Sequence, residues 1–246
     1  MREPQTVGSL GPSAFANLMA GIAHRPQIQP GPVDDAPNPD EPGHPEYHRN
    51  RRADWALKRW ATTTPPRYRR ADATLPDVQQ WADRAAADPE TAGSLLLTGT
   101  TGTGKTHEAY GALRRIAAAG PHVYEIVATT AADMYGLLRP KGSDRGTEEE
   151  LRRLCRVPLL LLDDLGSAKA SEWTEEVTYR LINERYNACR PSIYTSNLPA
   201  DSRDEHGHRQ GPDLTTVLGE RIVSRLSEDT HVIAMTGRDR RRGAAA

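Results

Sequence analysis

The chain has 246 residues, a formal net charge of −1 and two cysteines, Cys155 and Cys189. This length suffices for one α/β domain with an extension, and the charge excludes a protein that binds nucleic acid through a high overall positive charge. The wide spacing of the cysteines excludes a C-x-x-C zinc site and argues against a disulfide framework. Since no apolar run reaches about 18 residues and the chain begins without a signal-peptide pattern, we expect a cytoplasmic protein that does not contact membranes.

Residues 1–48 form a proline-rich extension that we expect to be largely disordered, because it holds nine of the 19 prolines. One short helix is predicted at 13–24. There Ser13 can serve as an N-cap, and four apolar residues recur at helical spacing: Phe15, Leu18, Met19 and Ile22. This helix either docks into a groove of a partner protein or folds back on its own domain.

Residues 49–70 form a basic and aromatic linker, in which the only acidic residue is Asp54. Two interpretations are open. The mixture of cations and aromatic rings is typical of a surface that binds single-stranded DNA. Alternatively, residues 54–61 form a helix whose tryptophans pack on the core. The residues concerned are Arg49, Arg51, Arg52, Lys58, Arg59, Arg67, Arg69 and Arg70, with Trp55, Trp60 and Tyr68.

Residues 71–240 alternate between apolar strand-like runs and helical patterns. We predict strands at 94–98, 122–128, 157–162, 192–196 and 231–235, and helices at 76–87, 105–119, 130–138, 147–155, 171–189 and 214–226. Strands separated by helices are typical of an α/β fold, in which helices cover both faces of a parallel sheet. A ligand is expected at the carboxyl ends of the strands. Residues 241–246 are predicted to be a tail.

A phosphate-binding loop follows the strand at 94–98. Residues 99–106 read Gly-Thr-Thr-Gly-Thr-Gly-Lys-Thr and match the P-loop pattern G-x-x-x-x-G-K-[ST]. The glycines let backbone N–H groups surround phosphates, Lys105 reaches the β- and γ-phosphate oxygens, and the Thr106 hydroxyl binds Mg²⁺. We therefore predict a site for a nucleoside triphosphate and Mg²⁺. The predicted binding residues are Gly99, Thr100, Thr101, Gly102, Thr103, Gly104, Lys105, Thr106 and His107.

Two carboxylates follow the apolar strand at 157–162. In isolation, an Asp-Asp pair after an apolar run is more typical of a turn or of the start of a helix. A P-loop upstream favours a Walker B element instead. Asp163 is then expected to hold Mg²⁺ through water, and Asp164 to orient or deprotonate the attacking water, since phosphoryl transfer depends mainly on positioning and charge neutralisation.

Asn197 follows the strand at 192–196. Its amide can hydrogen-bond the attacking water or the γ-phosphate, a role called sensor 1, although a turn residue that merely ends the strand is the alternative. The strand at 122–128 lies between the P-loop and the two aspartates. This order favours an AAA+/RecA-like P-loop NTPase over a nucleotide kinase.

Five segments, taken in order, resemble the DnaC/IstB-type AAA+ ATPases, which comprise bacterial and phage helicase loaders and transposition helper ATPases. They lie at 99–107, 161–166, 181–186, 195–198 and 218–226. The resemblance covers roughly residues 65–240. It implies ATP hydrolysis coupled to homo-oligomerisation in the ATP state, binding of single-stranded DNA and, for a loader, a replicative helicase as partner. Because the sequence ends soon after Arg242, we expect a domain without a C-terminal lid, which agrees with the lidless members of that family. The proline-rich extension does not resemble the helicase-binding domain of the best-known loaders.

The same resemblance implies an arginine that reaches the γ-phosphate of a neighbouring subunit, and Arg221 and Arg225 are the two candidates. They stand four residues apart and so share one helix face. We expect a helicase loader with catalytic residues Lys105, Asp164, Asn197 and one of these arginines. Two alternatives stay open: an IstB-like transposition helper, and an assembly switch gated by the nucleotide with little hydrolysis, because many AAA+ proteins carry Glu where this chain has Asp164.

Overall fold

The structure is a computed structural model that describes residues 16, 20, 40–203, 206–237 and 239. The chain divides into two units, Met1–His44 and Pro45–Ala246, and the elements below belong to the second. Of the helix predicted at 13–24, only Ala16 and Ala20 are described, and both are helical. The tail at 241–246 lies outside the described residues. No described helix is both long and apolar enough to cross a membrane.

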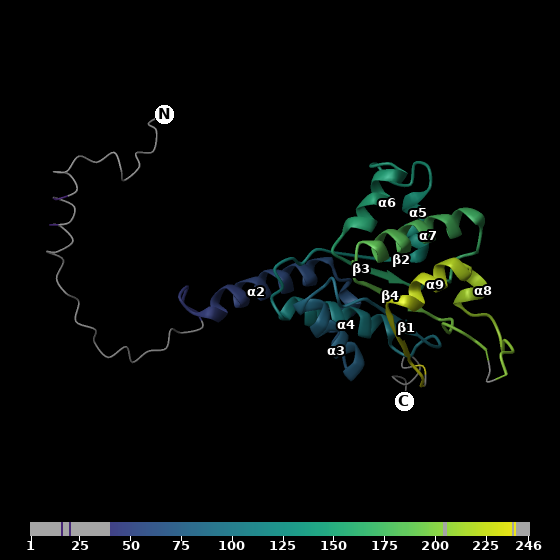
Figure 1. Cartoon of the computed structure of the whole chain (residues 1–246), viewed down its shortest axis with the longest axis horizontal. Helices are drawn as coiled ribbons and strands as arrows, with labels where there is room; N and C mark the ends of the chain where they lie inside the picture. Colours follow the sequence, from purple (N-terminus) through teal and green to yellow (C-terminus); the bar gives the residue numbers. More distant parts are fainter. Residues whose placement is uncertain (1–15, 17–19, 21–39, 204–205, 238, 240–246) are drawn as a thin grey trace. The chain divides into compact units, whose positions relative to one another are not determined.

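A five-stranded parallel sheet forms the centre of this unit (Figure 1). Its strands are β1 (Ser94–Thr98), β2 (Ile126–Thr130), β3 (Leu159–Asp163), β4 (Ser192–Ser196) and β5 (Thr230–Ala234), in the spatial order β2-β3-β4-β1-β5. The prediction of an α/β fold is confirmed. The strand predicted at 122–128 was placed too early, because pairing with β3 begins only where Ile126 meets Leu159.

The helices are α2 (Pro45–Thr63), α3 (Pro76–Ala87), α4 (Lys105–Ala118), α5 (Ala131–Leu138), α6 (Thr147–Arg156), α7 (Glu172–Asn187), α8 (Leu214–Leu218) and α9 (Glu220–Glu228), with a short 3-10 helix, η2, at Pro66–Tyr68. The single helix predicted at 214–226 was wrong. Gly219 has a φ of 89°, a left-handed conformation that helical residues do not adopt, and it separates α8 from α9.

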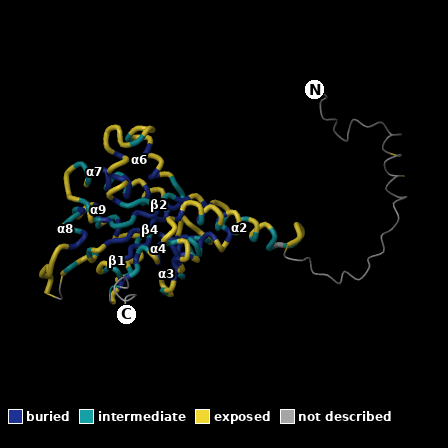
Figure 2. The backbone as a smooth tube through the Cα atoms, turned by 180° about the vertical axis from the view of Figure 1, so that it is seen from behind, coloured by how far each residue is buried: buried dark blue, intermediate teal, exposed yellow. Residues whose placement is uncertain are grey.

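The sheet separates two apolar cores, seen as dark blue segments between exposed outer turns in Figure 2. Leu95 and Leu97 of β1 face the core shared with α2, α3 and α4, whereas Leu96 faces the core shared with α5 to α9. Successive side chains of a strand point to opposite faces. An uninterrupted leucine run therefore serves a strand that is buried on both sides.

Helix α2 is longer than the helix expected at 54–61, and one side of it packs on α4. Ala56 and Trp60 are buried against α4. The indole N–H of Trp60 donates to the carbonyl of Tyr110 at 3.2 Å, and the Arg52 guanidinium donates to the carbonyl of Gly120 at 2.9 Å. These contacts lie 50 and 68 residues apart in sequence, so local patterns could not reveal them.

Candidate nucleotide-binding site

The P-loop connects the carboxyl end of β1 to the first turn of α4. Gly99, Gly102 and Gly104 have φ values of 139°, 88° and 101°. At Gly99 an added Cβ would lie 2.1 Å from the carbonyl oxygen of Met235, which follows β5. The loop can therefore reach this position only with glycine at its first residue. Within the loop, the Thr103 hydroxyl donates to the carbonyl of Thr100 at 3.0 Å.

Lys105, the first residue of α4, directs its ammonium group back across the loop. Its Nζ donates to the carbonyls of Gly99 and Thr100 at 2.7 and 2.8 Å, and to Oδ1 of Asn197 at 2.9 Å. Only 5% of Lys105 is exposed. The structure thus brings Lys105 and Asn197 together, as their predicted roles at one phosphate require.

Asp163, at the tip of β3, faces Thr106 across the loop. The Thr106 hydroxyl donates to the two carboxylate oxygens at 3.0 and 3.2 Å, and the Thr195 hydroxyl donates to Oδ1 at 2.5 Å. Burial raises the pKa of Asp163 above its usual range and the Asp164 carboxylate adds to this, whereas the hydrogen bonds from Thr195 and Thr106 oppose it. This part of the site is therefore a partly buried carboxylate next to a hydroxyl.

This pair fits Mg²⁺, which prefers oxygen ligands and uses one or two carboxylates together with phosphates and waters. Among the described residues, no group of three or more His, Cys, Asp or Glu side chains could hold a metal ion by itself. A metal at Thr106 and Asp163 would thus depend on a phosphate ligand for part of its coordination.

Asp164 has a φ of 57°, a left-handed conformation that is uncommon for residues other than glycine. Its backbone N–H donates to the Thr195 hydroxyl at 2.9 Å, and its Oδ1 accepts from the Asn197 amide at 3.1 Å. Asn197 therefore lies between Lys105 and Asp164. The unusual backbone conformation is held by contacts on both sides, as is common at functional sites.

Thr195 is a site residue that the sequence analysis missed. It is fully buried in β4, and it contacts both Asp163 and Asp164. The available signal was a hydroxyl in a buried strand, two residues before a predicted sensor. Of this strand and its tip, only Asn197 was predicted as a site residue.

A pocket of about 620 Å³ opens beside these groups, a size typical of sites for small ligands. Tyr68 of η2 stacks on Tyr110 with ring centroids 4.8 Å apart, and its ring meets His107 edge-on at 6.2 Å. The pocket is lined by Arg67, Tyr68, Thr101, Gly102, Gly104, Lys105, Thr106, His107, Asp163, Asp164 and Asn197. Most of the predicted site residues thus converge on one pocket, and Arg67 and Tyr68 join them from the preceding segment.

Arg221 and Arg225 do not line this pocket. Both stand on α9 and lie over tyrosines of α7: the Arg221 guanidinium is 4.3 Å from the ring of Tyr179, and that of Arg225 is 5.0 Å from the ring of Tyr186. Arg225 also pairs with Glu228 at 3.4 Å. Neither arginine therefore serves the nucleotide pocket of its own chain in this structure.

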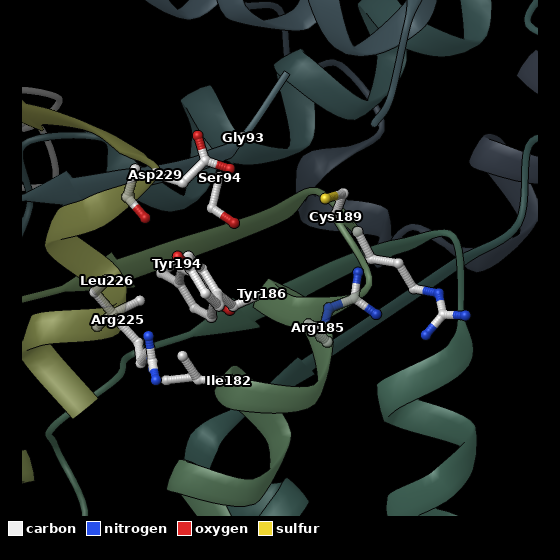
Figure 3. Close-up of a pocket in the computed structure, with 12 residues that line it drawn as sticks. Gly93, Ser94, Ile182, Arg185, Tyr186, Cys189, Tyr194, Arg225, Leu226 and Asp229 are labelled. Atoms are coloured by element: carbon white, nitrogen blue, oxygen red, sulfur yellow. The ribbon is translucent and has the colours of Figure 1, made fainter. Parts of the chain in front are cut away.

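A second cavity, of only about 20 Å³, lies where β1 and β5 begin, at the opposite edge of the sheet (Figure 3). Arg185 of α7 lies beside it and is 1% exposed. Its guanidinium donates to the Ser192 hydroxyl and to the carbonyls of Leu154, Cys155, Val157, Pro158 and Pro191 at 2.7 to 3.4 Å. The space left is that of about one water molecule.

Comparison with known proteins gives several relatives of moderate sequence identity. The chain is 28% identical over 211 residues to an ATP-binding protein of an insertion sequence from Mycobacterium tuberculosis, a match that covers 79% of this chain and 80% of that protein. It is 25% identical over 149 residues to the replicative helicase loader DnaI of Bacillus subtilis, which covers 60% of this chain and 47% of the loader. The chain thus spans about half the length of several curated relatives it matches.

Among solved structures, the DnaC helicase loader superposes with a TM-score of 0.54 at 27% identity, covering 73% of this chain and 99% of that one. The fold is accordingly that of the P-loop AAA+ proteins. The profile of the IstB-like ATP binding proteins matches residues 71–244, well over half of the chain. The chain therefore belongs to the family of IstB-like ATP-binding proteins.

Proposed function

We propose that this protein hydrolyses ATP. The observation that carries the proposal is the convergence of Lys105, Asp163, Asp164 and Asn197 on one pocket, from segments up to 92 residues apart. Lys105 would exchange its loop carbonyls for β- and γ-phosphate oxygens. Asp164 would hold the attacking water. Asn197, which already contacts both Lys105 and Asp164, would keep that water in line with the γ-phosphate.

Mg²⁺ would be held by the Thr106 hydroxyl and the Asp163 carboxylate, and when bound it supplies neutralisation of charge on the phosphates. Thr195 fixes the orientation of Asp163 through its 2.5 Å hydrogen bond. Tyr68 and His107 line the same pocket as the P-loop residues. We assign these two rings to the adenine base, which aromatic faces can stack against.

We further propose that the protein forms a homo-oligomer in the ATP state, in which Arg221 or Arg225 reaches the γ-phosphate of a neighbour. Both arginines lie outside their own pocket, which supports a role in another subunit. An arginine supplied in this way stabilises charge in the transition state, so that hydrolysis depends on assembly. ATP binding and turnover of alanine variants of each arginine would identify which of the two acts, since the variant that lacks the acting arginine should bind ATP but lose hydrolysis.

For the cellular role we propose a cytoplasmic helicase loader, which engages a replicative helicase and single-stranded DNA. The similarity to the DnaC and DnaI loaders supports this role. A second candidate is a helper ATPase in transposition. It is favoured by the insertion-sequence relative, whose match covers 80% of that protein, against 47% of the loader.

The deciding experiment is native mass spectrometry of the protein mixed with the replicative helicase of its host, with ATP and without nucleotide. A complex that requires ATP supports the loader and gives its stoichiometry. Lys105→Ala is the matched control, since it should form no such complex. If no complex forms in either state while ATP turnover is measurable, the loader role is wrong and the transposition helper takes its place. If the protein assembles with ATP but turns over almost none, it acts as a nucleotide-gated switch.

A further inference from the structure

Helix α2 carries a ladder of alternating aromatic and basic side chains beside its buried stripe. Tyr47, Arg51, Trp55 and Arg59 follow one another at intervals of four residues, and residues four apart are neighbours on a helix surface. At a rise of about 1.5 Å per residue, one member stands about every 6 Å along the helix. We call these four residues the α2 ladder.

Each ring of the α2 ladder is paired with the cation that follows it. The Arg51 guanidinium lies 5.7 Å from the centroid of the Tyr47 ring and donates to its hydroxyl at 3.2 Å. The Arg59 guanidinium likewise lies 5.7 Å from the centroid of Trp55. Such cation–π pairs restrict both side chains. The helix thus presents two units, each a flat ring with a positive charge over one face, so that the other face is the one a base can stack on.

The exposure of Trp55 is unusual for this protein. It is 54% exposed, whereas Trp60 on the same helix is 4% exposed and Trp81 is fully buried. Ala56 and Trp60 already attach α2 to α4, so packing does not require a second tryptophan at position 55. Figure 2 shows α2 as mostly exposed or intermediate turns, drawn yellow and teal. Tryptophan and tyrosine are enriched at binding surfaces, where their large rings supply an apolar face with a polar group beside it.

The charge around the α2 ladder is positive. Within Pro45–Thr63 five Lys or Arg residues face only two acidic ones, and one of these, Glu46, pairs with Arg49 at 2.8 Å. Three exposed arginines continue the run after the helix, namely Arg67, Arg69 and Arg70. Arg67 also lines the nucleotide pocket. A polyanion bound along α2 would therefore approach the site proposed for ATP.

We propose that the α2 ladder binds single-stranded nucleic acid, with bases stacked on Tyr47 and Trp55 and phosphates held by Arg51 and Arg59. Single-strand binding surfaces combine these two elements, aromatic faces for the bases and cations for the backbone. An acidic protein would use the cations but has no need of flat rings between them. This inference rests on the proposed function, which includes binding of single-stranded DNA, and it assigns that binding to α2.

The test measures binding of a fluorescein-labelled oligo(dT) by fluorescence anisotropy, with ATP and over a range of salt concentrations. Trp55→Ala should weaken binding about tenfold, the loss of one stacked base, and Trp55→Phe should restore most of it. Arg59→Ala should make the salt dependence less steep by about 0.7 unit of slope, the contribution of one phosphate contact on a single strand. Arg139→Ala is the matched control. It removes one exposed arginine from a similar contact, 5.9 Å from the ring of Trp173 at another site, and should bind like the parent.

Unchanged affinity in Trp55→Ala, or an equal loss in Arg139→Ala, would overturn the assignment of the α2 ladder. Helicase binding lost in Trp55→Ala with oligo(dT) affinity intact would also overturn it, in favour of a protein-binding surface. If the parent binds no oligo(dT) in any nucleotide state, the ladder and the DNA contact of the proposed function fail together. ATP turnover and complex formation on the same preparation would still decide the rest of that function.

Discussion

Two buried cations occupy opposite edges of the same sheet, and they serve different purposes. Lys105, at the carboxyl ends of the strands, is 5% exposed and donates to two loop carbonyls and to Asn197. Arg185, at the amino ends, is 1% exposed and donates to the oxygens of six residues. None of these hydrogen-bond partners is a buried carboxylate, so neither cation is held by a buried salt bridge with them.

The difference between the two edges is the space beside the cation. A pocket of about 620 Å³ adjoins Lys105, and a cavity of about 20 Å³ adjoins Arg185. Burial lowers the pKa of Arg185 to about 10, so the group remains charged at neutral pH, and its hydrogen bonds join the end of α6 to the start of β4. A buried cation therefore indicates a ligand site only where an anion has room to replace its protein partners.

The largest effect is expected at the carboxyl ends of the strands, where Lys105 adjoins the larger pocket. Lys105→Ala should weaken ATP binding at least 100-fold, because the phosphates lose their buried charge partner, while the free energy of unfolding changes by only about 1 kcal/mol. Binding is measured with a fluorescent ATP analogue, and stability by urea unfolding. If affinity stays within a few-fold of the parent, Lys105 does not contact the phosphates.

Arg185→Met should show the reverse pattern. The variant leaves buried carbonyl oxygens without a donor and should lower the free energy of unfolding by about 3 kcal/mol, while the folded protein keeps its affinity for ATP. Arg185→Lys should recover only part of the loss, because an ammonium has three donors on one atom and cannot reach oxygens on several sides. A variant that unfolds like the parent but fails to bind ATP would show that the surroundings of Arg185 are coupled to the nucleotide pocket at the other end of the strands.

Asp164→Asn should separate ATP binding from ATP hydrolysis within the nucleotide pocket. The amide keeps the size of the side chain and one oxygen, but it cannot take a proton from water. ATP affinity should stay within a few-fold of the parent, while turnover falls about 100-fold. Parallel binding and phosphate-release assays measure the two quantities. Turnover equal to that of the parent would remove Asp164 from the reaction.

The smallest effect is expected for the stability of the nucleotide-free protein. The pKa of Asp163 is raised on folding, so its charged form is less favourable in the native than in the unfolded chain, and at neutral pH it destabilises the fold. Asp163→Asn should therefore increase the free energy of unfolding at pH 7, by about 1 kcal/mol or less. This gain should shrink as acid protonates the native carboxyl. A variant that is less stable at pH 7 would mean that the hydroxyls of Thr106 and Thr195 outweigh the cost of burial.

The chemistry of the site was readable from the sequence because it is encoded locally. The P-loop places backbone N–H groups, Lys105 and Thr106 within eight consecutive residues. The two aspartates follow directly after a leucine run, which favours a strand buried on both faces. Helix and strand positions in 71–240 also followed from local periodicity to within two residues, except at Gly219 and at the start of β2.

Contacts between distant segments were decided by the tertiary structure. The link from Lys105 to Asn197 spans 92 residues, and the hydrogen bond of Thr195 to Asp163 spans 32. The sequence likewise left open whether the tryptophans of α2 face the core or solvent. In the structure Trp60 is buried on α4, whereas Trp55 is exposed. The sequence by itself thus determined which groups could bind a nucleotide. Their mutual arrangement required the packed sheet, because the side-chain contacts of one residue depend on elements far from it in the chain.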